Sequence, residues 1–193
     1  MFLPIIGDLP FPRGKTGAQG LITPTSTYQG NLEGKAFFSE DTVHSTGVPV
    51  VVLCVRNTSG SAITVARKFA QFDNTTAKSC ASAIDVFPNV TAGGLCAPLD
   101  DAYVVGGSIP DDDLFYVVIR GFCSVLTSAS VTNLTAGEPV SSDNGGFIAN
   151  VNGGSAAGEF VVGTVDYASS YSASTATRMF VDIAALALPP AAG

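Results

Sequence analysis

The side chains that could carry out chemistry in this sequence are few, and they form no recognisable catalytic set. The single histidine, His44, lies in the segment 41–47, Asp-Thr-Val-His-Ser-Thr-Gly. No Gly-x-Ser-x-Gly nucleophile elbow occurs in the 193 residues. Acid–base and nucleophilic catalysis require partner groups within hydrogen-bonding distance of one another. We therefore interpret His44 as an ordinary loop residue and expect a protein without enzymatic activity.

Two further motifs resemble ligand sites but lack the required spacing. Gly14-Lys15-Thr16 ends like a phosphate-binding loop, yet six residues separate Gly14 from Gly7 where that loop has four. The run Asp111 to Asp113, with Asp100 and Asp101 nearby, offers carboxylates for a cation. Calcium loops instead alternate their oxygen ligands around a sharp glycine turn. We expect a solvated loop corner here, with no metal and no cofactor.

The four cysteines indicate neither a zinc site nor a disulfide framework. Cys54, Cys80, Cys96 and Cys123 form no Cys-x-x-Cys pair and have no histidine beside them. Cys54 and Cys123 lie within apolar strand-like segments, where a thiol packs as a small hydrophobic side chain. Whether Cys80 and Cys96 pair depends on the redox environment, and that question stays open.

The charge distribution excludes some classes of partner. The net charge of −7 and the pI near 4.4 give the wrong sign of field for binding a nucleic acid backbone. Residues 100–193 hold ten acidic side chains and two basic ones, Arg120 and Arg178, so this half carries the whole negative excess. No apolar run is long enough to span a bilayer, and the first residues lack the basic region of a signal peptide. We expect neither nucleic acid nor membrane as a partner.

Residues 1–35 predict an extended N-terminal arm. Four prolines and six glycines interrupt this stretch too often for a helix or a long strand. A purely solvated linker would not carry so many large apolar side chains, so the arm needs an apolar groove on its own domain or on a neighbour. A disordered tail is the alternative. The residues that we expect to lie in such a groove or to contact another subunit are Phe2, Leu3, Ile5, Ile6, Leu9 and Phe11.

Residues 36–193 predict a single all-β domain, either a small β-barrel or a β-sandwich. Charged residues make up only 13%, whereas glycine, proline, serine and threonine are abundant, as in turn-rich β proteins. Short β-branched and aromatic runs at even spacing support this interpretation. The stretch 77–99 is an insert of uncertain structure, with a short helix possible at 78–86.

Individual strands can be placed by the same criteria. We expect a hairpin over 48–72, from two strands at 48–56 and 62–72 joined at Asn57-Thr-Ser-Gly60. A short strand is possible at 103–105, before the polar corner at 109–113. The strongest strand signal is 114–127, with a bulge or bend at Gly121. A second hairpin joins 139–141 to 146–150 across Asp143-Asn-Gly-Gly. Two more strands follow at about 159–167 and 177–186.

The order of these C-terminal segments resembles the small β-barrel of tailed-bacteriophage head decoration proteins, also called cement proteins. The similarity rests on Leu134-Thr-Ala-Gly-Glu-Pro-Val140, Asp143-Asn-Gly-Gly146, Phe160-Val-Val-Gly-Thr-Val165 and Arg178-Met-Phe-Val-Asp-Ile183. The earlier segments Val55-Arg-Asn-Thr-Ser-Gly60 and Leu114-Phe-Tyr-Val-Val-Ile-Arg-Gly-Phe-Cys123 resemble the preceding strands of such proteins. The resemblance covers about residues 48–187, whereas the arm and the insert depart from the compact members of the family.

The resemblance implies a non-enzymatic virion structural protein. Such proteins are made in the host cytoplasm, bind the outside of an assembled capsid through the major capsid protein, and often form homotrimers. Two alternatives remain: a virion adhesin or glycan-binding module, and another assembly part such as a tail-tube or head-completion subunit. The absence of tryptophan makes the glycan-binding alternative less favoured, because such sites usually present exposed aromatic rings.

Overall fold

The fold is all-β, as predicted. The structure is a computed structural model, and it describes residues 36–39, 47–57, 59–64, 67–72, 84–85, 96–99, 108–109, 114–129, 131, 134–143, 147–150, 161–166 and 174–183. Strands account for 71% of these residues, and none of them is helical. Within the same part of the chain, no helix is long and apolar enough to cross a membrane.

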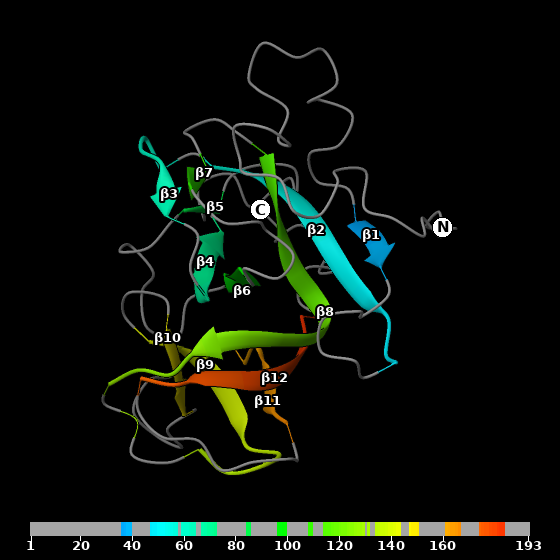
Figure 1. The fold of residues 1–193 in the computed structure, drawn as a ribbon, viewed down its shortest axis with the longest axis vertical. Helices are drawn as coiled ribbons and strands as arrows, with labels where there is room; N and C mark the ends of the chain where they lie inside the picture. The colour runs from blue at the N-terminus through cyan, green and yellow to red at the C-terminus, as the bar shows by residue number, and fades with distance from the viewer. Residues whose placement is uncertain are drawn as a thin grey trace, which may run out of the picture.

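Seven antiparallel strands form the main sheet, in the order β1-β2-β8-β12-β11-β9-β10 (Figure 1). The outer strands on one side are β1 and β2, and β10 lies at the opposite edge. The strand bounds are β1 Ala36–Ser39, β2 Val50–Arg56, β8 Leu114–Leu126, β9 Pro139–Asp143, β10 Phe147–Asn150, β11 Gly163–Val165 and β12 Ala176–Asp182.

The long strand β8 turns a corner and thereby serves two halves of this sheet. Its first half pairs with β2 and its second half, from Arg120 onward, pairs with β12. Gly121, at the corner, has a φ of +113°, and a Cβ there would lie 3.0 Å from the Cα of Val50. The register against β2 shifts between Val51 and Val52. Figure 1 shows β8 bending between its two partners, which confirms the predicted bend.

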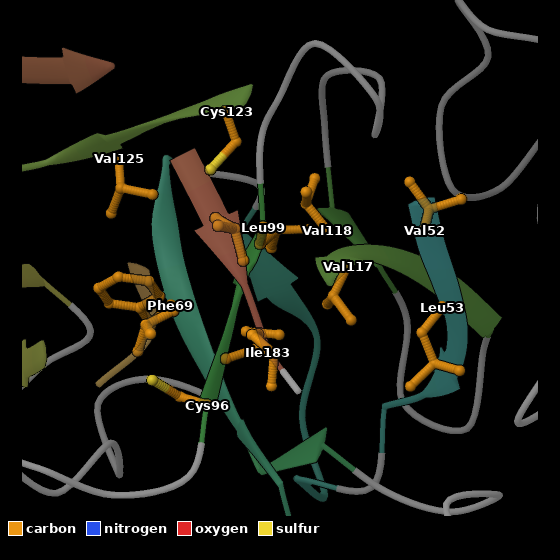
Figure 2. Packing of buried hydrophobic residues seen from close by; sticks show 14 of the residues in the cluster. Val52, Leu53, Phe69, Cys96, Leu99, Val117, Val118, Cys123, Val125 and Ile183 are labelled. Carbon is orange, nitrogen blue, oxygen red and sulfur yellow. The ribbon is translucent and has the colours of Figure 1, made fainter. Parts of the chain in front are cut away.

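Two smaller sheets cover the inner side of the bent sheet. One has the order β5-β4-β6, with β4 at Lys68–Phe72, β5 at Ile84–Asp85 and β6 at Cys96–Leu99. The other pairs β3, Ile63–Thr64, with β7, Ser108–Ile109. Figure 2 shows Cys123 and Val125 of β8 directed into the core, with Phe69 of β4 and Leu99 of β6 in the same cluster. All four side chains are completely buried.

The described strands do not close into a barrel and are consistent with a β-sandwich. A single parallel bridge links Thr127, just after β8, to Ile148 of β10. The amide of Ser128 also donates to the carbonyl of Ile148 at 2.9 Å. One bridge fixes the end of β8 beside β10 without forming a ladder, so of the two predicted architectures the sandwich is supported.

Two expectations from the first half of the chain are wrong. The predicted hairpin over 48–72 does not form, because β2 pairs with β1 and β8 instead of the strand that follows it. That following segment is divided into β3 and β4, which join different small sheets. The possible helix at 78–86 is wrong where it can be checked, since Ile84 and Asp85 form β5.

The C-terminal predictions are closer to the structure. Strands β9 and β10 form the predicted hairpin, with Phe147 opposite Asp143. Strand β11 lies within its predicted range but is shorter, whereas β12 begins one residue before its predicted range and ends at Asp182. The proposed strand at 103–105 and the acidic corner after Ile109 lie outside the described residues.

Candidate functional site

The side chains of β12 alternate between the core and the outer face of the sheet. Thr177, Met179 and Val181 are buried, whereas Arg178 and Phe180 are partly exposed and Asp182 is exposed. This period of two follows from the pleat, which sends successive side chains to opposite faces. The outward set of β12 therefore forms a row on the side of the sheet away from the core.

The adjacent half of β8 supplies a second outward row. Phe122 lies opposite Phe180, and Arg120 lies opposite Asp182. The two phenylalanine rings meet edge to face, with centroids 5.2 Å apart and planes at 73°. Such a geometry places the positive edge of one ring on the negative face of the other. We call this surface the Phe122–Phe180 face; it comprises Arg120, Phe122, Ser124, Thr164, Asp166, Arg178, Phe180 and Asp182.

Arg178 connects the aromatic pair to the next strand. Its guanidinium carbon lies 5.5 Å from the centroid of the Phe122 ring, within the range of a cation–π contact. Its Nε donates to Oδ2 of Asp166 at 2.5 Å, and its Nη2 forms an ion pair with the same oxygen. The side chains of Arg178 and Asp166 are 34% and 12% exposed. The guanidinium is thus held in place by a carboxylate and a ring together.

The charge on this face differs from that of the surrounding sequence. Arg120 and Arg178 are the only basic residues in 100–193, a region that holds ten acidic ones. Both lie on this face, together with Asp166 and Asp182. The two arginines and two aspartates balance, so the face is formally neutral on a chain of net charge −7.

This arrangement suits contact with another macromolecule better than it suits catalysis. Aromatic residues and arginine are enriched in protein–protein interfaces, where they supply most of the binding energy. Arg178 is already paired, and no imidazole or thiol lies among the residues of the face. Among the described residues, no three histidine, cysteine or acidic side chains are grouped so that they could hold a metal ion.

Other polar contacts in the described part of the chain hold loops in place. The amide of Asn57 is buried and donates to the carbonyls of Ser61 and Ile109, at 2.8 Å and 3.1 Å. The hydroxyl of Ser128 donates to Asp143 at 2.5 Å and ties the end of β8 to the β9–β10 hairpin. We therefore assign a structural role to Asn57 and Ser128.

The three cysteines that the structure describes are buried and have a structural role. Cys54 and Cys123 are completely buried in strands, as predicted. Cys96 is a free thiol on β6. Its pKa is raised from 9.0 to about 12, because burial outweighs the lowering effect of a hydrogen bond with Ser142. A thiol with so high a pKa is not a nucleophile at neutral pH.

Most residues singled out from the sequence lie outside the described part of the chain. They are Phe2, Leu3, Ile5, Ile6, Leu9 and Phe11 of the arm, His44, Cys80, the Gly14–Thr16 segment and the five aspartates at 100–101 and 111–113. Sequence reasoning noticed the isolation of Arg120 and Arg178 but did not connect them with Phe122 and Phe180. The alternation of outward residues on two strands was the available signal, but which strands are neighbours depends on the fold.

Comparison with known proteins gives no relative: no protein-family model matches this chain, and no curated protein matches it significantly.

Proposed function

We propose that this chain is a bacteriophage virion structural protein that binds the outside of an assembled capsid and stabilises it. The proposed partner is the major capsid protein, the proposed location is the capsid surface, and no catalytic step is involved. The observation that carries the proposal is the placement of the segments that resemble decoration proteins. The described parts of those segments overlap β2, β8, β12, β11 and β9, which are consecutive neighbours in the main sheet.

That placement is informative because the segments are scattered along the sequence. The strands are neighbours in an order different from their order in the chain: β12 lies between β8 and β11. A chance likeness of separate glycine-containing strands would not need to fall within one continuous sheet. The segments that carry the resemblance therefore lie in one structural unit, which supports the proposal.

The physical basis for capsid stabilisation is mass action. A protein that binds the assembled shell but not its dissociated subunits stabilises the shell by its binding free energy. Many identical sites on one particle multiply a modest contact into a large total effect. The described body suits such a role, since it has a well-packed core.

The arm enters the described structure at an edge of the sheet. Residues 1–35 lead directly into β1, which pairs with β2 and has no other neighbour among the described strands. Phe37 of β1 is buried, so the start of the body is anchored in the core. From this position the apolar residues of the arm can contact a neighbouring capsid subunit, and we propose that they do.

The test uses expanded shells of a tailed phage that lack any decoration protein. Purified full-length protein is mixed with the shells, and co-sedimentation and thermal disruption are measured across a protein concentration series. We expect saturable binding and a disruption temperature that rises with protein concentration. Unexpanded shells and dissociated capsid subunits are the controls and should bind less. Absence of the protein from mature particles, or turnover of a substrate by the isolated protein, would contradict the proposal.

A further inference from the structure

We infer that two copies of this chain associate face to face through their Phe122–Phe180 faces. The two copies are related by a two-fold axis that lies between the two sheets, runs perpendicular to the strands and passes over Phe180 and Phe122. The inference concerns the protein alone, and it stands or falls independently of any capsid. It rests on the charge balance of the face, on the register of β12 with β8, and on the composition of its centre.

The charge balance determines where two copies can approach. Each copy carries a net charge of −7, so two copies repel one another overall unless the surfaces that meet are neutral or complementary. The Phe122–Phe180 face carries the only two basic residues of 100–193 and two acidic ones, and is therefore neutral. Like charges placed opposite one another in an interface oppose association, whereas complementary ones favour it. A second copy therefore meets no net like charge on this face.

The register makes the face complementary to itself. Arg178 and Asp182 flank Phe180 by two residues on either side, and all three side chains point outward from β12. Two residues of a strand span about 6.6 Å, so the two charges lie at equal distances from Phe180. The two-fold axis lies in the plane between the two sheets, passes over Phe180 and runs at right angles to β12, so it exchanges these two positions. Arg178 of each copy then faces Asp182 of the other copy, and the ion pair occurs twice.

The neighbouring strands fit the same axis. Phe122 of β8 and Thr164 of β11 lie directly opposite Phe180, so the axis passes over both. Arg120 and Ser124 flank Phe122 in the same way, and the rotation places the arginine of one copy over the hydroxyl of the other. Strands of the two sheets then run nearly antiparallel, within the angular range of aligned sheet packing.

The centre of the face has the composition of an interface core. Phe122 and Phe180 lie in the middle and are partly exposed, whereas Arg120 and Asp182 lie at the rim and are exposed. Exclusion of water by the rings strengthens the charge pairs around them, because the local dielectric falls. Arg178 is already oriented by Asp166, so little side-chain entropy is lost when Asp182 of the second copy reaches it.

The experiment is a charge-reversal exchange measured by analytical ultracentrifugation of the full chain. The wild-type protein should form a dimer. Asp182→Arg places two arginines opposite one another, and Arg178→Glu places two acids opposite one another. Each variant alone should weaken dimerisation about tenfold or more. An equimolar mixture of the two variants should restore a heterodimer, because both contacts between positions 178 and 182 are again between opposite charges.

A control separates this contact from general charge effects and from loss of folding. Ala62→Arg adds a positive charge at an exposed position before β3, outside the face, and should leave the dimer unchanged. Circular dichroism should show the same β content for all variants. A wild-type monomer, a trimer insensitive to both substitutions, or a mixture that stays monomeric would overturn the inference. The three-fold oligomer implied by the decoration-protein resemblance is thus distinguishable from the two-fold contact argued from the face.

Discussion

The buried hydroxyl of Thr177 is the clearest single-residue defect in the core. The residue is completely buried on β12, opposite Val125, and its Oγ1 has no hydrogen-bond partner among the described residues. A buried hydroxyl without a partner loses its hydration and gains nothing in return. Thr177→Val replaces it with a methyl group of similar shape. We expect the free energy of unfolding to rise by about 1 kcal/mol in urea denaturation.

A matched threonine provides the control for this substitution. Thr127 is also completely buried, but its hydroxyl donates to the carbonyl of Thr175 and accepts from the amide of the same residue. Thr127→Val removes both contacts and should lower the free energy of unfolding by about 1 kcal/mol. If both variants lose stability to the same extent, Thr177 has a partner and the interpretation of its hydroxyl is wrong.

Cys96 gives the protein a dependence of stability on alkaline pH. The pKa of this thiol is raised from 9.0 to about 12, because burial outweighs the lowering effect of the hydrogen bond with Ser142. Above pH 9.0 the thiol of the unfolded chain loses its proton, whereas the folded thiol keeps it. Unfolding then releases a proton, and stability falls as pH rises from 9.0 to about 12. The limiting slope for one group is about 1.4 kcal/mol per pH unit.

The measurement compares wild type with Cys96→Ala by urea denaturation at several pH values from about 8 to 11. The variant lacks the sulfur and is less stable at every pH, because it leaves a small cavity. Its stability should nevertheless fall less steeply above pH 9.0 than that of the wild type. Parallel curves for the two proteins would show that Cys96 does not titrate as its burial requires.

At the scale of the strand, Gly163 allows a close approach that the main sheet needs. A Cβ on Gly163 of β11 would lie 2.2 Å from the carbonyl oxygen of Phe180 on β12. That neighbour is backbone and cannot move without breaking the ladder between the two strands. Gly163→Ala should therefore lower the free energy of unfolding by more than about 3 kcal/mol, as severe overpacking does.

Alanine substitutions at two other glycines should cause smaller losses of stability than Gly163→Ala. Gly121 combines a φ of +113° with a Cβ position 3.0 Å from Val50, so Gly121→Ala should also destabilise the fold, by about 2 to 3 kcal/mol. Gly60 has a φ of +75° and no atom within 4 Å of its Cβ position. Gly60→Ala should cost only about 1 kcal/mol, from backbone strain alone. Equal losses for all three in chemical denaturation would contradict the packing argument.

The strands themselves were more predictable than their partners. The β-branched and aromatic runs at β2 and β8 are local features, and both strands were predicted nearly to their ends. The turn signal at Asn57 is also real, since its side chain binds Ser59 and Ser61. The predicted hairpin failed because pairing is decided by burial of the whole sheet, which favours β1 and β8 beside β2.

The same distinction explains what was missed at the candidate face. The alternation along β12 and β8 is visible in the sequence, but it does not show which set of side chains points to the core. Neither does it show that Phe122 and Phe180 lie opposite one another, because about sixty residues separate them. The C-terminal hairpin was predictable, since a short turn fixes both its partner and its register.

For the whole molecule, the proposed function assigns different tasks to residues 1–35 and to the body: the body folds by itself, and the arm contributes to shell binding. The described core begins at Phe37, and each strand of the main sheet lies within residues 36–182. Deleting residues 1–35 should therefore leave the cooperative unfolding of the body intact. If the apolar arm supplies contacts to neighbouring capsid subunits, the truncated protein should bind expanded shells more weakly and raise their disruption temperature less, because fewer contacts contribute at each site.

A second variant separates the apolar side chains of the arm from its length. In this full-length protein, serine replaces Phe2, Leu3, Ile5, Ile6, Leu9 and Phe11, and the chain keeps all 193 residues. It should bind shells as weakly as the truncated protein, since burial of apolar area is what the arm contributes. If the serine variant and the truncated protein both reinforce shells as well as the wild type does, the arm has no part in binding. The contact would then lie on the body, outside residues 1–35.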